Sequence, residues 1–199
     1  MPLSEIRQVS AHTRLGLWRM DERPEELLAS FPHLRSLPMP YKHEGRQREF
    51  LSVRALLSVM TGDNSLVIGH EPSGKPTLPD WHISISHTKG YAALILSQTE
   101  PVAVDIEQRS DRVGRIANRF IRPDEEADTL ERMLTVWSAK ETLYKLHSED
   151  SLQFFEMRVR EWHPHHLIIE NMKSGQFVTL HHELTADYVL TYHPTTPQR

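Results

Sequence analysis

The spacing of hydrophobic residues in the first hundred positions predicts short strands around one long helix. Apolar side chains recur at helical spacing across residues 45–61, which predicts a helix there with Gly62 as its C-cap. Arg46 and Arg54 lie roughly 80° apart around such a helix, so both can face one ligand. A short strand is predicted within 11–20, a short helix over 24–30 and turns over 71–80. Two further strands are predicted over 81–86 and 91–97, joined by a hairpin loop.

The second hundred positions alternate between apolar and polar residues in several short runs, which is typical of antiparallel strands. An apolar strand is predicted over 102–107, and a helical stretch opens at Pro123 and Asp124 and runs towards His147. Later strands are predicted over 154–160, 166–170, 177–182 and 186–192. The order of these elements predicts an α+β fold of two halves, residues 1–100 and 101–199.

Composition narrows the class of protein without changing these elements. At 199 residues, 38% hydrophobic and 25% charged, the chain has the balance of a globular protein, and its apolar runs are too short to span a bilayer. It has no cysteine, and its first residues lack the layout of a signal peptide, so a cytoplasmic location is expected. The net charge of −4 disfavours nucleic-acid binding, whereas arginines gathered within 42–54 and 109–122 suit a small anionic ligand or an acidic protein partner.

Two acids at the end of the predicted strand over 102–107 form the first candidate site. Asp105 and Glu107 point to the same face of a strand, roughly 6–7 Å apart, while Ile106 points to the core. Two such carboxylates repel each other unless a cation lies between them, and Mg²⁺ prefers hard oxygen ligands of this kind. Standing alone, however, the D-x-E motif is more often a strand end whose two solvated acids pair with nearby arginines.

A second candidate lies in the helical stretch, where Trp137, Glu141 and Lys145 follow one another at intervals of four residues. They drift by about 40° per step and therefore share one stripe of the helix. Glu141 followed by Lys145 is the favoured order of a helical ion pair, so a surface salt bridge beside a core tryptophan is one interpretation. The other places a third carboxylate on the metal and an ammonium on a phosphate, and spacing alone does not separate the two.

Small polar groups upstream of the acids are candidates for binding phosphate. Lys75 lies on a constrained G-K-P turn, which is a suitable place for a fixed ammonium. Ser86 and His87 end a predicted strand, so a hydroxyl, an imidazole and turn amides are available there to oxyanions. Taken alone, each of these residues is more simply a solvated turn or a loop side chain satisfied by the backbone.

Five short motifs occur along the chain in one order. They are G-K-P, I-S-H-T-x-G, V-D-I-E, F-I-R-P-D-E and W-S-A-K-E-x-x-x-K. In this order the chain resembles the 4′-phosphopantetheinyl transferases, in particular their larger, pseudodimeric class. The resemblance covers about residues 74–145, and the arginine-bearing helix extends it more loosely. Single motifs of this kind arise by chance, but five in order do not.

The resemblance implies an activity, that of a holo-[acyl-carrier-protein] synthase. The family transfers the phosphopantetheine arm of coenzyme A to a serine of an apo carrier protein and releases 3′,5′-ADP. Asp105, Glu107 and Glu141 are thereby implied to bind Mg²⁺, and Lys145 to assist the transfer. We further expect Glu141 to accept the serine proton, directly or through water. The residues implied or proposed to contact the phosphates of the coenzyme are Lys75, Ser86, His87, Arg46 and Arg54.

The resemblance also implies a fold and partners. It predicts two similar α/β halves in a pseudo-twofold arrangement with the coenzyme between them, and a monomer, since one chain is long enough to make both halves. The expected partner is an apo carrier protein with an acidic helix, which Arg112, Arg115 and Arg119 are candidates to meet. Two alternatives stay open: a Mg²⁺-dependent phosphohydrolase that acts without a carrier protein, and a coenzyme-binding protein that no longer transfers the group.

Overall fold

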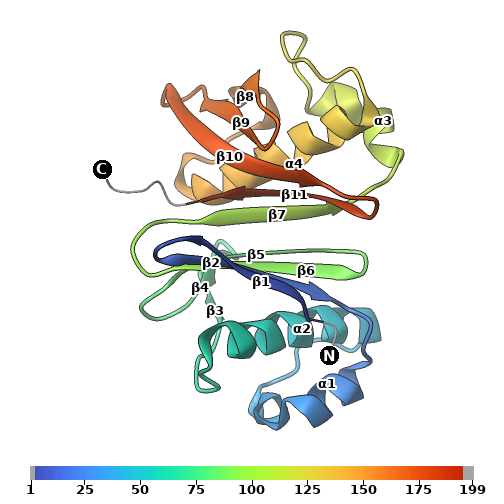
Figure 1. The fold of residues 1–199 in the computed structure, drawn as a ribbon, viewed down its shortest axis with the longest axis vertical. Coiled ribbons are helices and arrows are strands. Elements are labelled where there is room, and N and C mark those ends of the chain that lie inside the picture. Colours follow the sequence, from blue (N-terminus) through green and yellow to red (C-terminus); the bar gives the residue numbers. More distant parts are fainter. Residues whose placement is uncertain (1–2, 195–199) are drawn as a thin grey trace. The chain divides into compact units, whose positions relative to one another are not determined.

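The computed structural model describes residues 3–194, and these divide into two compact units, residues 3–100 and residues 101–194. In each unit, antiparallel strands form a sheet on which one long helix packs (Figure 1). This content confirms the α+β class expected from the sequence, whereas the pseudo-twofold arrangement stays a prediction. Within the described residues, no helix is both long enough and apolar enough to cross a membrane.

The first unit is a four-stranded sheet in the order β1-β2-β6-β5, with helix α2 packed against β2 and β6 (Figure 1). Strands β3 and β4 pair with each other in a separate two-stranded hairpin, and β4 contacts β5. The elements are β1 (Leu3–Ser10), β2 (Thr13–Arg19), α1 (Pro24–Ser30), the 3₁₀ turn η1 (Pro32–Ser36), α2 (Glu44–Thr61), β3 (Gly69–His70), β4 (Pro76–Thr77), β5 (His82–Thr88) and β6 (Tyr91–Ser97).

Helix α2 has residues at its ends and along its contact with the sheet that suit those positions. The His43 ring accepts a hydrogen bond from the Gly45 amide, and Gly62 ends the helix at a φ of +71°, which glycine adopts without strain. On β2, a Cβ at Gly16 would lie 2.5 Å from the sulfur of Met60. The glycine therefore permits the close approach of helix and sheet that closes this core.

The second unit is a five-stranded sheet in the order β7-β11-β10-β9-β8, with helix α4 packed most closely against β7 and β11 (Figure 1). The last strand of the chain thus lies beside the first strand of this unit. The elements are β7 (Ala103–Gln108), α3 (Arg112–Ile116), the 3₁₀ turns η2 (Ala117–Arg119), η3 (Ser148–Asp150) and η4 (Phe154–Glu156), α4 (Leu130–Leu146), β8 (Met157–Trp162), β9 (His166–Asn171), β10 (Gln176–Leu184) and β11 (Tyr188–His193).

The helical stretch expected from Pro123 is the main error of the sequence analysis. Helix α4 begins only at Leu130, after Thr129, whose hydroxyl accepts a hydrogen bond from a first-turn amide. A turn and a bend at residues 123–125 are followed by irregular backbone up to Thr129 instead. The Glu125 carboxylate in this segment is held by the buried ammonium of Lys140, which fixes the segment outside the helix.

Two strands also differ from expectation. Strand β1 was not predicted, because its sequence mixes polar and apolar residues without clean alternation and it lies at the edge of its sheet, largely half-buried or exposed. Strand β5 continues to Thr88, so His87 lies within the strand rather than in the hairpin loop. The turn is left with Lys89 and Gly90, and Gly90 supplies the positive φ of +84° that a two-residue turn needs.

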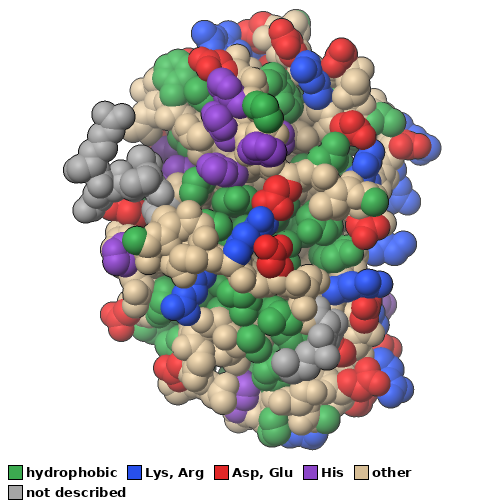
Figure 2. All heavy atoms as spheres, in the orientation of Figure 1, with side chains coloured by type: hydrophobic (Ala, Val, Ile, Leu, Met, Phe, Trp, Pro, Cys, Tyr) green, Lys and Arg blue, Asp and Glu red, His purple; other side chains and the backbone are tan. Residues whose placement is uncertain are grey.

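Histidine side chains gather on the second unit, over β9 and β10 (Figure 2). The rings of His163 and His166 stack with centroids 4.3 Å apart, and the ring of His181 lies 5.3 Å from that of Tyr192. A ring nitrogen binds a metal in the plane of its own ring, and two stacked planes do not meet at one ion. These histidines therefore pack as aromatic rings on the sheet.

Candidate functional site

Strand β7 presents two acids on one face. Asp105 is 3% exposed and Glu107 is half-buried, while Val104 and Ile106, which alternate with them, are buried. Strand β11 pairs with β7 in a register that sets Thr191 opposite Asp105. Because the neighbouring strand and the buried apolar residues fix the backbone, the two carboxylates are delivered from a rigid element.

Helix α4 brings a lysine and a tryptophan to these acids. The Nζ atom of Lys145 lies 2.8 Å from Oδ1 of Asp105, and Nε1 of Trp137 donates a hydrogen bond of 2.9 Å to Oε1 of Glu107. Glu141 lies between Trp137 and Lys145 on the same stripe of the helix. The residues that the sequence placed on a strand and on a helix are therefore neighbours, and Lys145 pairs across to the strand.

The three carboxylates repel one another. Burial and then the charge of Asp105 raise the pKa of Glu107 to about 7, although the hydrogen bond from Trp137 opposes the shift. Burial and the charge of Asp105 raise the pKa of Glu141 as well, and the ammonium of Lys145 opposes that shift. Three acids face one neutralising lysine here, so the cluster attracts a further cation.

Mg²⁺ fits this cluster by the type of its donor atoms. Among residues 3–194, no three histidine, cysteine, aspartate or glutamate side chains are already arranged to hold a metal ion. Lys145 binds one oxygen of Asp105, and Trp137 binds one oxygen of Glu107. Carboxylate oxygens are nevertheless the ligands that Mg²⁺ takes, and a cation would relieve the repulsion that raises the pKa values. The metal role of these acids stays a prediction.

The raised pKa of Glu107 predicts that the metal-free protein loses stability as the pH rises. In the fold Glu107 keeps its proton up to about pH 7, whereas the unfolded chain loses it near 4.5, so the folded state binds more protons between these values. Protonated Glu107 therefore stabilises the fold fully below its unfolded-state pKa of 4.5. This stabilisation is lost as the pH rises through its folded-state pKa of about 7.

Thermal unfolding of the metal-free wild type and of Glu107→Gln, followed from about pH 5 to about pH 8, measures this contribution. The melting temperature of the wild type should fall relative to that of the variant as the pH rises, and added Mg²⁺ should offset the fall at the upper end. A difference between the two proteins that stays constant over this range would contradict the assignment.

A buried ion pair fastens helix α4 next to the acids. Lys140, which precedes Glu141, is fully buried, and its Nζ lies 2.7 Å from Oε2 of Glu125. The same ammonium donates to the carbonyl oxygens of Phe120, at 2.7 Å, and Phe154, at 3.2 Å. Burial lowers the pKa of Lys140, and the charge of Glu125 opposes that shift. One lysine thus ties the helix to the segments before and after it.

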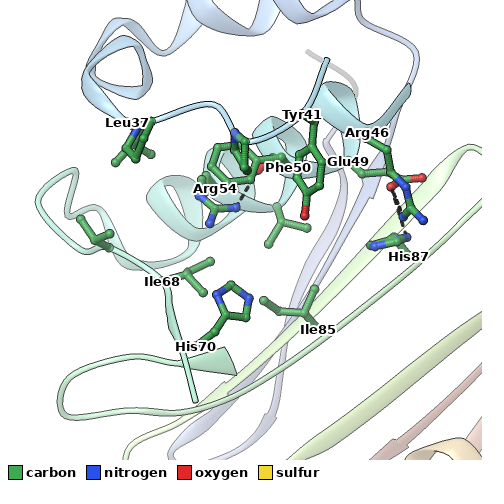
Figure 3. Close-up of a pocket in the computed structure, with 14 residues that line it drawn as sticks. Leu37, Tyr41, Arg46, Glu49, Phe50, Arg54, Ile68, His70, Ile85 and His87 are labelled. Carbon is green, nitrogen blue, oxygen red and sulfur yellow. Dashed lines mark hydrogen bonds and ion pairs between the residues drawn. The ribbon is translucent and has the colours of Figure 1, made fainter. Parts of the chain in front are cut away.

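The first unit contains a cavity of about 420 Å³ between α2, β5 and the neighbouring loops (Figure 3). Its lining is mainly apolar, with Arg46, Arg54 and His87 among its polar members. Apolar walls with a few polar groups are typical of pockets for small molecules. Three of the five residues expected to contact the coenzyme therefore line one cavity.

The charged groups of this cavity are held by neighbours on α2. The guanidinium of Arg54 lies 3.4 Å from the centre of the Phe50 ring, and burial lowers its pKa to about 10, so it stays charged at neutral pH. Glu49 pairs with Arg46 at 2.9 Å and lies 3.8 Å from Nδ1 of His87, as the dashed lines in Figure 3 show. This end of the cavity offers two basic side chains gathered around one acid.

The other two residues expected at the coenzyme do not line this cavity. Lys75 lies in the turn of the β3–β4 hairpin, beside Gly74, which has a φ of +89°. Ser86 and His87 are adjacent on β5, so their side chains point to opposite faces of the sheet. The buried Ser86 hydroxyl therefore does not share the face on which His87 reaches the cavity.

Sequence reasoning missed the partners that hold the site in place. Trp137 had no predicted partner, and a core position was one of two interpretations of its motif, whereas it is half-buried and donates a hydrogen bond to Glu107. Its spacing of four residues from Glu141 was the signal available. The Lys140–Glu125 pair had a weaker signal, because its two members lie in separate motifs and nothing in their spacing predicts a contact.

Comparison with known proteins bears on the second unit. None of the curated proteins that were compared matches the chain. The matched segment of the family model begins at the residue where the second unit begins, and it contains the three acids of the carboxylate cluster and Lys145. Residues 101–193 match the 4′-phosphopantetheinyl transferase superfamily.

Proposed function

We propose that this chain transfers the 4′-phosphopantetheine group of coenzyme A to a serine of an apo carrier protein, as a holo-[acyl-carrier-protein] synthase. The observation that carries the proposal is the meeting of Asp105, Glu107, Glu141 and Lys145 within the segment that matches the family. In the reaction the serine Oγ bonds to the phosphorus of the arm, the bond from that phosphorus to 3′,5′-ADP breaks, and the serine proton leaves for a base.

Each residue of the cluster has a role in this proposal. Asp105, Glu107 and Glu141 hold Mg²⁺, which when bound neutralises charge on the pyrophosphate. Lys145 adds a positive charge beside the same phosphates, and Trp137 orients Glu107 through its hydrogen bond. Glu141, directly or through a water, accepts the serine proton.

The coenzyme and the carrier protein have separate binding groups in the proposal. Arg46, Arg54 and His87 bind phosphate of the coenzyme at the cavity of the first unit, while Lys75 and Ser86 contact it outside that cavity. Arg112, Arg115 and Arg119 meet the acidic helix of the carrier protein. The sheet and long helix present in each unit are what supports assignment to the larger, pseudodimeric class. A monomer and a cytoplasmic location stay predictions.

A transfer assay tests the proposal directly. The protein is incubated with coenzyme A, Mg²⁺ and a panel of apo carrier proteins from fatty-acid, polyketide and peptide synthesis, and intact mass is measured. One phosphopantetheine group should be added to a single serine, and addition should stop when a chelator removes the metal. Failure of every carrier to gain mass, with properly folded carriers and coenzyme present, would overturn the proposal.

The same assay separates the two alternatives. A Mg²⁺-dependent phosphohydrolase would release phosphate from coenzyme A or other phosphoesters without any carrier protein. A protein that only binds the coenzyme would retain it without turnover. Burial and the charge of Asp105 raise the pKa of Glu107 and of Glu141. A site without a cation does not offset this cost, which favours an active enzyme over the binding protein.

Replacing Arg54 by methionine should weaken binding of coenzyme A without slowing the chemical step. Methionine keeps much of the packing against Phe50 but removes the charge, and a hydrogen bond to a charged group contributes about 1.5–3 kcal/mol. The KM for coenzyme A should rise about tenfold or more while kcat stays nearly constant. Arg35→Met, at an exposed position outside the cavity, is the matched control. An unchanged KM for coenzyme A in Arg54→Met would contradict binding of the coenzyme in this cavity.

A further inference from the structure

Three buried hydroxyl groups form a chain between helix α4 and the sheet of the second unit. Ser138 and Thr142 lie one turn apart on α4, and both approach Thr191 on β11. The Thr191 hydroxyl lies 2.9 Å from the hydroxyl of Ser138 and 2.6 Å from that of Thr142. All three side chains are fully buried. They link this helix directly to β11.

The chain of hydroxyls ends on the residue that begins the carboxylate cluster. The Ser138 hydroxyl lies 3.5 Å from the backbone oxygen of Asp105. Asp105 is also the residue that lies opposite Thr191 in the pairing of β7 with β11. One orientation lets every hydroxyl donate once: Thr142 to Thr191, Thr191 to Ser138, and Ser138 to the oxygen of Asp105. Such a directed chain polarises its members and holds both ends at one separation.

The helix positions that carry the hydroxyls also carry the chemistry. Seen down the axis of α4, Ser138, Thr142, Glu141 and Lys145 fall within roughly 100° of one another. A slide or rotation of the helix that broke the contacts to Thr191 would therefore also move Glu141 and Lys145 away from Asp105.

We infer that Thr191, together with Ser138 and Thr142, is a positioning residue that sets helix α4 at the depth where Glu141 and Lys145 meet Asp105. The inference rests on the proposed function, since it concerns the residues proposed to hold Mg²⁺ and assist transfer. Thr191 is fully buried, so its role is indirect and needs no contact with the metal or the substrates. It acts by fixing the distance between the strand that supplies two acids and the helix that supplies the third.

The test replaces Thr191 by valine, which keeps the shape and removes the hydroxyl. Mg²⁺ binding is measured by calorimetry without substrates, and kcat and the KM for coenzyme A are measured in the transfer assay. The affinity for Mg²⁺ and kcat should each fall about tenfold or more, the usual effect of losing a group that supports metal ligands, while the KM for coenzyme A stays unchanged. Thr191→Ser restores the hydroxyl and should restore both quantities.

Thr135→Val is the matched control, because Thr135 is a buried threonine of the same helix whose hydroxyl donates to the carbonyl oxygen of Glu131 in that helix, at 2.9 Å. It should lower the melting temperature without changing Mg²⁺ affinity. Equal Mg²⁺ affinity in wild type and Thr191→Val, or no Mg²⁺ binding by the wild type, would overturn the inference. If Thr191→Val does not fold, Ser138→Ala is measured against the same criteria. A wild type that binds Mg²⁺ but modifies no carrier would defeat the proposed function and leave the calorimetric comparison to decide the inference.

Discussion

Asp105→Asn should abolish transfer of the phosphopantetheine group while leaving the fold intact. The substitution keeps the size of the side chain and its ability to accept a hydrogen bond from Lys145, but removes the charge expected to bind the metal. Removing one group that stabilises charge in a transition state typically lowers kcat by about a hundredfold or more, and a metal ligand belongs at the upper end of that range. The rate of carrier modification by mass spectrometry measures the effect.

Stability gives this variant a second and opposite prediction. The charge of Asp105 raises the pKa of both Glu107 and Glu141, so removing it relieves repulsion in the metal-free protein. The melting temperature of metal-free Asp105→Asn should therefore equal or exceed that of the wild type, and Mg²⁺ should no longer raise it. Asp128→Asn, at a side chain that is 79% exposed, is the matched control and should behave as the wild type does. Full activity in Asp105→Asn would remove the metal site from the proposal.

Local patterns were sufficient to predict the long regular elements. The apolar spacing and the glycine at its end predicted α2, and the alternation along the chain predicted most strands of both sheets, with bounds close to those observed. The start of α4 was not predictable in the same way. Pro123 and the acids after it are typical of a first helical turn, but Glu125 binds Lys140 and Thr129 supplies the cap further on. A contact across fifteen residues overrides the local preference here.

The candidate site follows the same division. Strand alternation predicts that Asp105 and Glu107 share a face, and helical spacing predicts that Trp137, Glu141 and Lys145 share a stripe, and the structure has both arrangements. The pairing of the strand with the helix depends on tertiary packing. The spacing of residues within one helix or strand does not predict which residues of other elements they contact. It therefore could not show that Lys145 pairs with Asp105 rather than with Glu141.

The position at which strand β5 ends decides which of the residues expected to bind the coenzyme can act together. Two residues in a turn can point to the same side, but two adjacent residues in a strand cannot. Because β5 extends to Thr88, Ser86 and His87 are on opposite faces, and only His87 reaches the cavity beside Arg46 and Arg54. An error of two residues in a strand boundary therefore changes which groups can bind one phosphate together.

Lys140→Met should be the most destabilising single substitution in the second unit. Methionine fills the space of the lysine stem but leaves the fully buried Glu125 carboxylate without its ammonium, and the carbonyl oxygens of Phe120 and Phe154 lose their donor. Breaking a buried ion pair from one side typically costs about 3–5 kcal/mol of the free energy of unfolding. Urea unfolding of the metal-free protein, monitored by tryptophan fluorescence, measures the loss.

The double variant Lys140→Met with Glu125→Gln distinguishes an unpaired charge from poor packing. If the cost arises from a buried carboxylate without a counter-ion, neutralising Glu125 should recover part of the lost stability. Glutamine can still accept the hydrogen bond from the amide of Val159, although its single oxygen cannot also accept the one from the amide of Arg122. If the cost arises from packing, the double variant should be no more stable than Lys140→Met. The pH dependence gives an independent check: the stability of Lys140→Met should rise on acidification, as Glu125 takes up a proton, relative to that of the double variant. A parallel response of the two variants to pH would contradict the assignment of the cost to the charge of Glu125.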